Sequence, residues 1–173
     1  PGLTSSHHIH HMAAKAVTFA EALEFGKDYA AQTIKNAKAL AVELHNLGFK
    51  VLGEKKGFTQ SHQAVVNVLD YGDGGKIEAD LEKANIIVNR QLIPGDIKAK
   101  RHYMHPGGIR LGSSEVTRLG MKESEMQQIA SFIKNIIIDK KDGKDIAKQV
   151  TEFRKKYQKT QYCFDNKLGA YEY

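Results

Sequence analysis

The chain has 173 residues, 41% of them hydrophobic and 27% charged, which is enough for one domain with a hydrophobic core of its own. It has no apolar run of membrane-spanning length, and its formal charge of +6 comes from lysines interleaved with acidic residues. We therefore expect neither a membrane nor a nucleic acid among its partners. The single cysteine, Cys163, cannot form an internal disulfide, which favours a reducing, cytoplasmic location.

The N-terminal part of the chain has the pattern of two helices. Between Met12 and Leu23 the apolar residues lie almost all around a helical surface, which predicts a helix buried against other elements. Gly26 predicts a break, and a second helix with a regular apolar face is expected from Lys27 to Leu47. Gly48 is suitably placed for the C-terminal cap of this second helix.

Four histidines precede the first predicted helix, at positions 7, 8, 10 and 11. His7 and His11 would share one helix face, and that spacing can bind a metal ion. No acidic residue or cysteine lies nearby, so metal binding is the less favoured interpretation. No metal site is predicted.

Short strands and helices alternate along the rest of the chain. Runs of β-branched and apolar residues predict strands at 49–52, 63–69, 86–88 and 109–111. Helical periodicity is found at 76–84, 122–138 and 144–157. The long connection from Gln91 to Gly108 is typical of a functional loop. This order predicts a small α/β fold in which helices cover one face of a mostly antiparallel sheet.

The stretch from His105 to Arg118 is the most distinctive in the chain. The glycines of Pro106-Gly107-Gly108 permit positive φ angles and close backbone approach, and Ser113-Ser114 offers a cap for a following helix. Arg110 lies between two apolar residues of a short strand and is expected on the opposite face from them. Its planar guanidinium suits a carboxylate or phosphate ligand. Taken alone, the pattern favours a plainer interpretation, a strand-edge arginine in a structural ion pair.

Several segments together resemble the C-terminal part of serine hydroxymethyltransferase, in particular of its archaeal type, a fold-type I enzyme that depends on pyridoxal phosphate. The most specific match is Gly108 to Ser113 with Thr117 to Gly120, which resembles the family's Gly-Ile-Arg-Leu-Gly-Thr and Thr-x-Arg-Gly sequences. Val88-Asn89-Arg90 through Pro94-Gly95-Asp96 resembles its Val-Asn-Lys and Pro-Gly-Asp stretch. Pro1-Gly2 with the following loop and His10 resembles the family's Pro-Gly and Gly-Gly-Pro-x-x-His segment, and the region from Ala13 to Leu47 resembles its long helical link into the small domain.

The resemblance implies a division of the chain and roles for several residues. Residues 1–45 would belong to or link from a large cofactor domain, 46–140 would form the small C-terminal α/β domain, and 141–173 a helix and tail. Arg110 would bind the α-carboxylate of serine or glycine. Ser5 and Ser6, where the family usually has glycines, would approach the cofactor phosphate across a homodimer interface. The pterin-binding loop would include Gln91, Pro94, Gly95, Asp96 and Tyr103.

The activity implied is the interconversion of serine and glycine, with transfer of a one-carbon unit to tetrahydrofolate or tetrahydromethanopterin. In the family the lysine that forms the Schiff base with the cofactor lies upstream of the Pro-Gly segment. We therefore expect these 173 residues alone to be inactive and to hold no covalently bound pyridoxal phosphate. Two alternatives stay open: a related fold-type I enzyme such as a threonine aldolase, and a stand-alone α/β domain that binds an anion.

Overall fold

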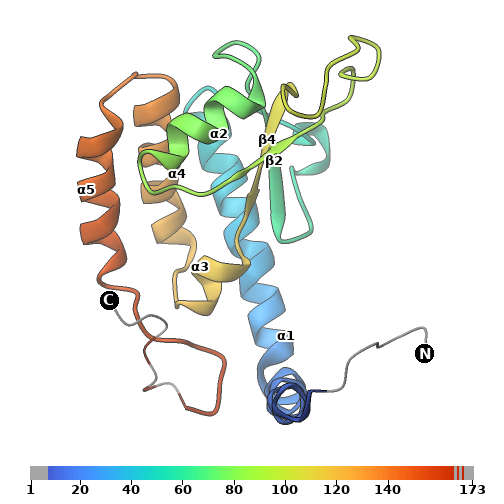
Figure 1. Cartoon of the computed structure of the whole chain (residues 1–173), viewed down its shortest axis with the longest axis vertical. Coiled ribbons are helices and arrows are strands. Elements are labelled where there is room, and N and C mark those ends of the chain that lie inside the picture. Colours follow the sequence, from blue (N-terminus) through green and yellow to red (C-terminus); the bar gives the residue numbers. More distant parts are fainter. Residues whose placement is uncertain (1–7, 166, 168, 170–173) are drawn as a thin grey trace.

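A single long helix, α1 (Ile9–Asn46), forms the axis of the molecule in the computed structural model, which describes residues 8–165, 167 and 169 (Figure 1). It ends where predicted, because Gly48 adopts the positive φ of 95° that stops the helix. The predicted break at Gly26 is wrong. A glycine inside a helix costs only about 1 kcal/mol relative to alanine, and the helix-forming residues on both sides outweigh that cost.

The predicted burial of residues 12–23 is also wrong for the described chain. Phe19 is 66% exposed and Leu23 is 90% exposed, and α1 begins to bury side chains only at Thr33. Apolar residues around a helix are buried only when other elements pack against that part of the helix. Here the remaining elements pack against the C-terminal half of α1.

The sheet has four strands in the order β1 (Lys50–Val51), β2 (Gln63–Asn67), β4 (Gly108–Gly112) and β3 (Asn89–Gln91). Every neighbouring pair is antiparallel, as the sequence predicted. A short 3₁₀ helix, η1 (Glu54–Lys56), follows β1. The strand predicted at 86–88 pairs three residues later, because the Ile86 amide still bonds to the Leu81 carbonyl of the preceding helical segment.

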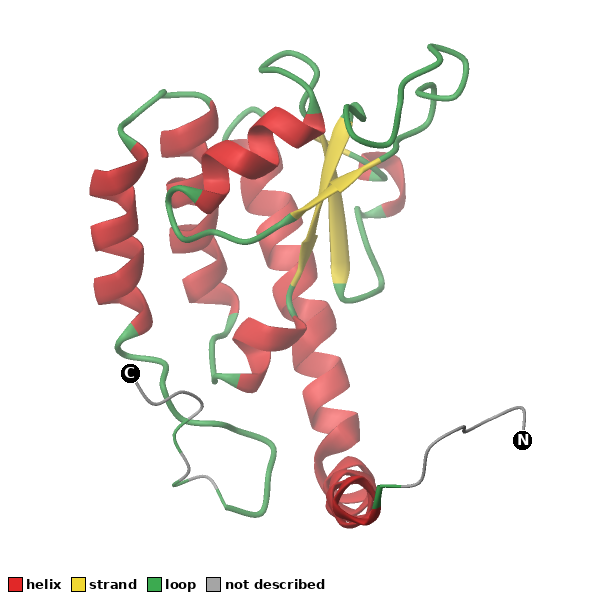
Figure 2. Cartoon of the chain, viewed as in Figure 1, coloured by secondary structure: helices red, strands yellow, loops and turns green. Residues whose placement is uncertain are grey.

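Helices cover one face of this sheet (Figure 2). Helices α1, α2 (Gly74–Glu82) and α4 (Glu123–Ile137) contact one another or the strands, and α5 (Gly143–Arg154) packs on α4. Along β2 the buried side chains alternate with half-buried ones, which places Ala64 and Val66 in the core. The short helix α3 (Ser114–Arg118) follows β4 and returns the chain to α1.

The glycines of the Pro106-Gly107-Gly108 turn serve close packing rather than positive φ. Neither Gly107 nor Gly108 has a positive φ angle. A Cβ atom on Gly108 would lie 2.4 Å from Cγ2 of Ile93, and one on Gly74 would lie 2.2 Å from the Gly108 carbonyl oxygen. The start of α2 therefore interlocks with the start of β4 at a distance that only glycines allow.

Candidate functional site

Arg110 lies on an inner strand of the sheet, on the face that the helices leave open. Its neighbours Ile109 and Leu111 are buried in the core at 0% and 6% exposure, while Arg110 is half-buried. The register sets it opposite Val65 of β2 and Asn89 of β3. The predicted orientation is confirmed. The strand-edge interpretation is wrong, because β4 is paired on both sides.

The guanidinium of Arg110 is available to a ligand. Arg90, Arg101 and Arg118 each pair with a carboxylate, whereas within the described residues no carboxylate lies within 4.0 Å of Arg110. Among the described residues its side chain has one hydrogen-bond partner, Asn89, whose side-chain oxygen accepts a hydrogen bond from Nη2 at 3.2 Å. A partly shielded, unneutralised arginine on a rigid strand is a suitable receptor for a carboxylate.

Ser113 holds the far end of β4 rather than capping α3 with its side chain. It is the N-cap residue of α3, but its hydroxyl makes no capping hydrogen bond, so the predicted side-chain cap is wrong there. The buried hydroxyl instead donates to the Thr33 carbonyl of α1 at 2.8 Å, and the Ser113 amide donates to the His62 carbonyl at 2.9 Å. The strand that carries Arg110 is thus tied to α1 and to the start of β2.

Asp96 organises the predicted pterin loop from inside. Its side chain is buried, and Oδ2 accepts hydrogen bonds from the amides of Ile93 at 3.0 Å and Gly107 at 2.7 Å. Arg101 approaches the other oxygen at 3.5 Å. The carboxylate therefore closes the base of the loop, directly before the strand that carries Arg110.

The other predicted loop residues lie at the surface. Tyr103 is 63% exposed, and its ring contacts that of His102 at a tilt of 44°, with ring centroids 4.4 Å apart. Pro94 is exposed, and Gly95 has a φ of 100° with open space around it. Gln91 ends β3, half-buried, and its amide nitrogen donates to the Leu92 carbonyl at 3.0 Å. These residues therefore belong to one loop, which begins at the end of β3 and reaches the surface.

Ser5, Ser6 and His7 lie outside the described residues. The rings of His8, His10 and His11 lie 4.2–5.6 Å apart at the start of α1. In the part of the chain that the structure describes, no group of three or more His, Cys, Asp or Glu side chains could hold a metal ion. No helix among the same residues is long and apolar enough to cross a membrane.

Residues 1–133 match the sequence model of the family described as serine hydroxymethyltransferase. The chain belongs to the serine hydroxymethyltransferase family. The serine hydroxymethyltransferases of Nitrosopumilus maritimus and Cenarchaeum symbiosum are 76% and 71% identical to it over all 173 residues. The chain spans 39% of the length of each of these relatives. The resemblance inferred from the motifs is therefore confirmed.

A solved structure supports the fold. L-threonine transaldolase from Pseudomonas fluorescens, in its internal aldimine state, superposes with a TM-score of 0.76 and is 38% identical. The match covers 89% of this chain and 34% of the transaldolase chain. The predicted fold class, a small antiparallel sheet with helices from a fold-type I enzyme, is confirmed.

Sequence reasoning missed two polar clusters around α3. One is the buried Asn36, which donates to the Thr117 hydroxyl at 2.8 Å and to the Met121 carbonyl at 2.9 Å. The other is the pairing of Glu21 with Arg118 at 2.8 Å. Both join residues more than 80 positions apart, so no local pattern could reveal them. A polar residue on the apolar face of the helix predicted at 27–47 was the available signal for Asn36.

Proposed function

We propose that the complete protein carrying this chain is a serine hydroxymethyltransferase that uses pyridoxal phosphate. It interconverts serine and glycine and transfers the one-carbon unit to a reduced pterin, tetrahydrofolate or tetrahydromethanopterin. The family membership supports this proposal, and the observation that carries it is the unneutralised Arg110 on an inner strand. Because the chain spans 39% of its relatives' length, the activity belongs to the whole protein, which acts as a homodimer.

In this proposal Arg110 binds the α-carboxylate of the amino acid. Two parallel N–H groups of a guanidinium match the two oxygens of a carboxylate. Asn89 engages only Nη2, so the remaining N–H groups are available to the substrate. Holding the carboxylate at two points would restrict the rotation of the amino acid and so set the orientation of the bonds at Cα toward the cofactor.

Among the described residues, Arg110 is suited to bind the substrate carboxylate, but no lysine is suited to form the covalent bond with the cofactor. A Schiff-base lysine must lose its proton readily, usually through desolvation or nearby positive charge. Among the described residues no lysine side chain is buried. We assign that lysine to a part of the protein outside this chain, and the phosphate contact to Ser5 and Ser6 across the dimer interface. When bound, the cofactor withdraws the electron pair that develops at Cα.

The loop between β3 and β4 is the proposed pterin-binding region. Tyr103 presents an exposed ring that can stack on a pterin, and Pro94 with Gly95 leaves an open surface beside it. Asp96 acts by holding the loop's shape, since its carboxylate is already occupied by two backbone amides. Gln91 lies at the root of the loop, at the end of the strand next to Arg110.

A second candidate is a transferase or aldolase that acts on another β-hydroxy amino acid. The superposition with L-threonine transaldolase favours it, because that enzyme shares 38% identity with most of this chain. Both candidates use Arg110 in the same way. They differ in whether conversion of serine to glycine depends on a reduced pterin, and that dependence is the discriminating measurement.

The variant Arg110→Lys tests the proposed function in the complete protein. Lysine keeps the charge but loses the two-pronged geometry. We expect transition-state stabilisation to fall by about 2–4 kcal/mol, which lowers kcat/KM for serine roughly 30- to 900-fold. The measurement is steady-state turnover of serine with and without reduced pterin.

Arg90→Lys is the matched control. Arg90 lies on the adjacent strand and pairs with Glu78 at 2.9 Å, so its replacement should leave serine turnover close to that of the wild type. Circular dichroism and thermal unfolding check that both variants fold. Near-normal kcat/KM in Arg110→Lys would refute the assignment of the carboxylate site.

A further inference from the structure

The N-terminal half of α1 extends away from the rest of the described chain (Figure 1). From His8 to Glu24 every residue is exposed except Glu21, and the first fully buried position of the helix is Thr33. A helical segment with so few buried contacts is held in place weakly. Within the described chain, the angle between the N-terminal half of α1 and the sheet is therefore set by the contacts of Glu21 and of the helical turns that follow it.

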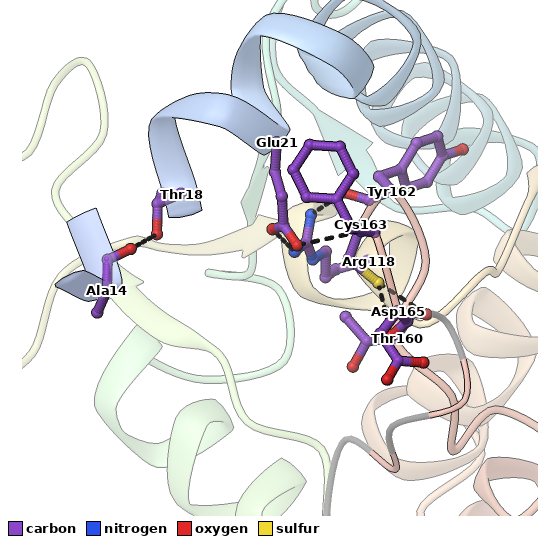
Figure 3. Close-up of polar contacts among 9 residues, drawn as sticks. Ala14, Thr18, Glu21, Arg118, Thr160, Tyr162, Cys163 and Asp165 are labelled. Atoms are coloured by element: carbon purple, nitrogen blue, oxygen red, sulfur yellow. Dashed lines mark hydrogen bonds and ion pairs between the residues drawn. The ribbon is translucent and has the colours of Figure 1, made fainter. Parts of the chain in front are cut away.

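The C-terminal tail crosses α1 at this position (Figure 3). Residues 157–165, here called the strap, follow α5 and run past α3 to reach Glu21. The amide of Gln161 donates to the Arg118 carbonyl at 2.7 Å, and the amide of Phe164 donates to Oε1 of Glu21 at 3.3 Å. The strap thus contacts both helices through its own backbone.

Arg118 joins the three segments. Nη1 donates to the Tyr162 carbonyl of the strap at 2.6 Å, and Nη2 donates to Oε2 of Glu21 at 2.8 Å. The side chains of Arg118 and Glu21 are 31% and 16% exposed. Because water and salt screen such a pair only in part, it is stronger than an ordinary surface ion pair. Both oxygens of Glu21 are used, one by the arginine and one by the strap.

Two aromatic contacts strengthen the connection. The ring of Tyr162 lies 5.3 Å from that of Tyr29, and the ring of Phe164 meets Phe25 edge-on at 5.4 Å. Tyr29 in turn donates its hydroxyl to the Ser114 carbonyl of α3 at 3.0 Å. Burial raises the pKa of the Tyr162 hydroxyl above its ordinary value, as expected for a packed ring. The strap therefore combines ionic, backbone and aromatic contacts on one side of α1.

We propose that the strap holds the N-terminal half of α1 at a fixed angle to the sheet, with Arg118 joining strap, α1 and α3. The match to the family ends at residue 133, before the strap, whereas the Nitrosopumilus maritimus relative aligns over all 173 residues. The strap thus lies outside the segment that defines the family. This conformational role holds whether or not the proposed function is correct.

Hydrogen–deuterium exchange of the complete protein tests the strap. Glu21→Gln removes the charge that Arg118 and the Phe164 amide share, and truncation after Gln158 removes most of the strap. In both variants we expect amide exchange in residues 15–29 to accelerate about tenfold, the effect of losing a charge-assisted contact. Exchange in residues 36–46 and in the sheet stays unchanged. Combining the two changes adds little, because both break the same connection.

Glu24→Gln is the matched control, since it removes an exposed charge from the same helix. The proposal would be overturned if residues 15–29 exchange at the wild-type rate in both the Glu21→Gln protein and the truncated protein. An equal acceleration in Glu24→Gln would overturn it as well, because loss of any negative charge would then suffice. If truncation unfolds the sheet, Phe164→Ala replaces it as the test, because this variant removes only a ring that is 61% exposed. Unchanged exchange of residues 15–29 in Phe164→Ala would then also overturn the proposal.

Discussion

At the scale of single residues, two aspartates beside the candidate site have structural tasks. Asp96 is buried and accepts two backbone amides at the base of the loop between β3 and β4. Asp73 is the N-cap residue of α2, where Oδ1 accepts the Lys76 amide at 3.0 Å, and His105 lies 3.4 Å from its other oxygen. Each aspartate therefore connects the glycine-rich turn before β4 to a neighbouring segment.

Asp96→Asn should destabilise the protein. Both backbone amides donate to the same oxygen, which the amide oxygen of asparagine can replace, but these buried bonds lose their charge assistance. The asparagine NH₂ group would in addition face the Arg101 guanidinium, which now lies 3.5 Å from Oδ1. We expect the free energy of unfolding to fall by about 1–3 kcal/mol. Urea unfolding measures the change, and Asp28→Asn on the exposed side of α1 is the control, with an expected effect within about 0.5 kcal/mol. Equal effects of the two changes would contradict this role for Asp96.

Asp73 should make a pH-dependent contribution to stability. The hydrogen bond from the Lys76 amide is the main cause that lowers the pKa of its carboxyl below the ordinary value, and His105 adds to it. Since the folded-state pKa is depressed, the stabilisation is complete above about pH 4 and is lost as the pH falls through the lowered pKa. Asp73→Ala should cost about 1 kcal/mol at pH 7.

The control for this prediction is Asp73→Asn, because asparagine is an equally good N-cap residue without a titrating group. Urea unfolding from pH 7 to pH 3 should show the deficit of Asp73→Ala relative to the wild type narrowing below about pH 4. A deficit that stays constant over this range would show that the ionised carboxylate adds nothing beyond a neutral cap.

At the scale of elements, α1 and α3 are joined by a buried polar junction rather than by apolar packing alone. Asn36 is 0% exposed, donates to Thr117 and Met121, and accepts from Gln32 at 2.9 Å. With the Ser113 hydroxyl on the Thr33 carbonyl, these bonds fix how α3 meets the long helix. Because α3 begins two residues after β4 ends, the junction also limits the movement of Arg110.

Asn36→Ala should therefore be costly. It leaves the buried Met121 carbonyl and Thr117 hydroxyl without their donor, and we expect a loss of about 1–3 kcal/mol in the free energy of unfolding. Asn46→Ala, at the exposed end of the same helix, should stay within about 0.5 kcal/mol of the wild type. Denaturant unfolding of both variants tests the difference, and a neutral Asn36→Ala would show that the junction relaxes without cost.

The sequence predicted elements well where a local pattern decided them. Arg110 between Ile109 and Leu111, the end of α1 at Gly48 and the amphipathic helix α4 all follow from spacing alone. The prediction failed at Gly26, where the helix-forming residues on both sides outweigh the cost of a glycine, and at β3, which begins at Asn89 because the Ile86 amide still bonds to the helical segment before it. The hydrogen bonds of Ser113 and Asp96 could not be predicted either, because their partners lie outside the short sequence motifs in which these two residues were recognised.

At the scale of the whole molecule, the described chain leaves one large apolar surface uncovered. Ile9, Met12, Phe19 and Leu23 share one side of α1 by their helical spacing and are between 53% and 90% exposed. We expect these 173 residues, prepared alone, to self-associate through this surface, since contiguous exposed apolar patches bind partners. Sedimentation should show dimers or larger species that Phe19→Lys with Leu23→Lys converts to monomers.

Ile87→Lys is the control, because Ile87 is 77% exposed but lies far along the chain from α1. It should leave the association unchanged. A strictly monomeric wild-type chain at high concentration, with its full helical content, would contradict this prediction.

The carboxylate of Asp96 also has a consequence for how the loop can vary in length. By tying the Ile93 and Gly107 amides together, it fixes the two ends of the connection, and residues 97–105 between them form an exposed tip, in which Arg101 and His105 contact Asp96 and Asp73. The entropy lost on closing a flexible loop rises only with the logarithm of its length, so doubling the tip costs roughly 0.6 kcal/mol. Insertions there should be tolerated without displacing Gly108 or Arg110. Under the proposed function, the pterin loop can thus vary in length among relatives while Arg110 keeps its position.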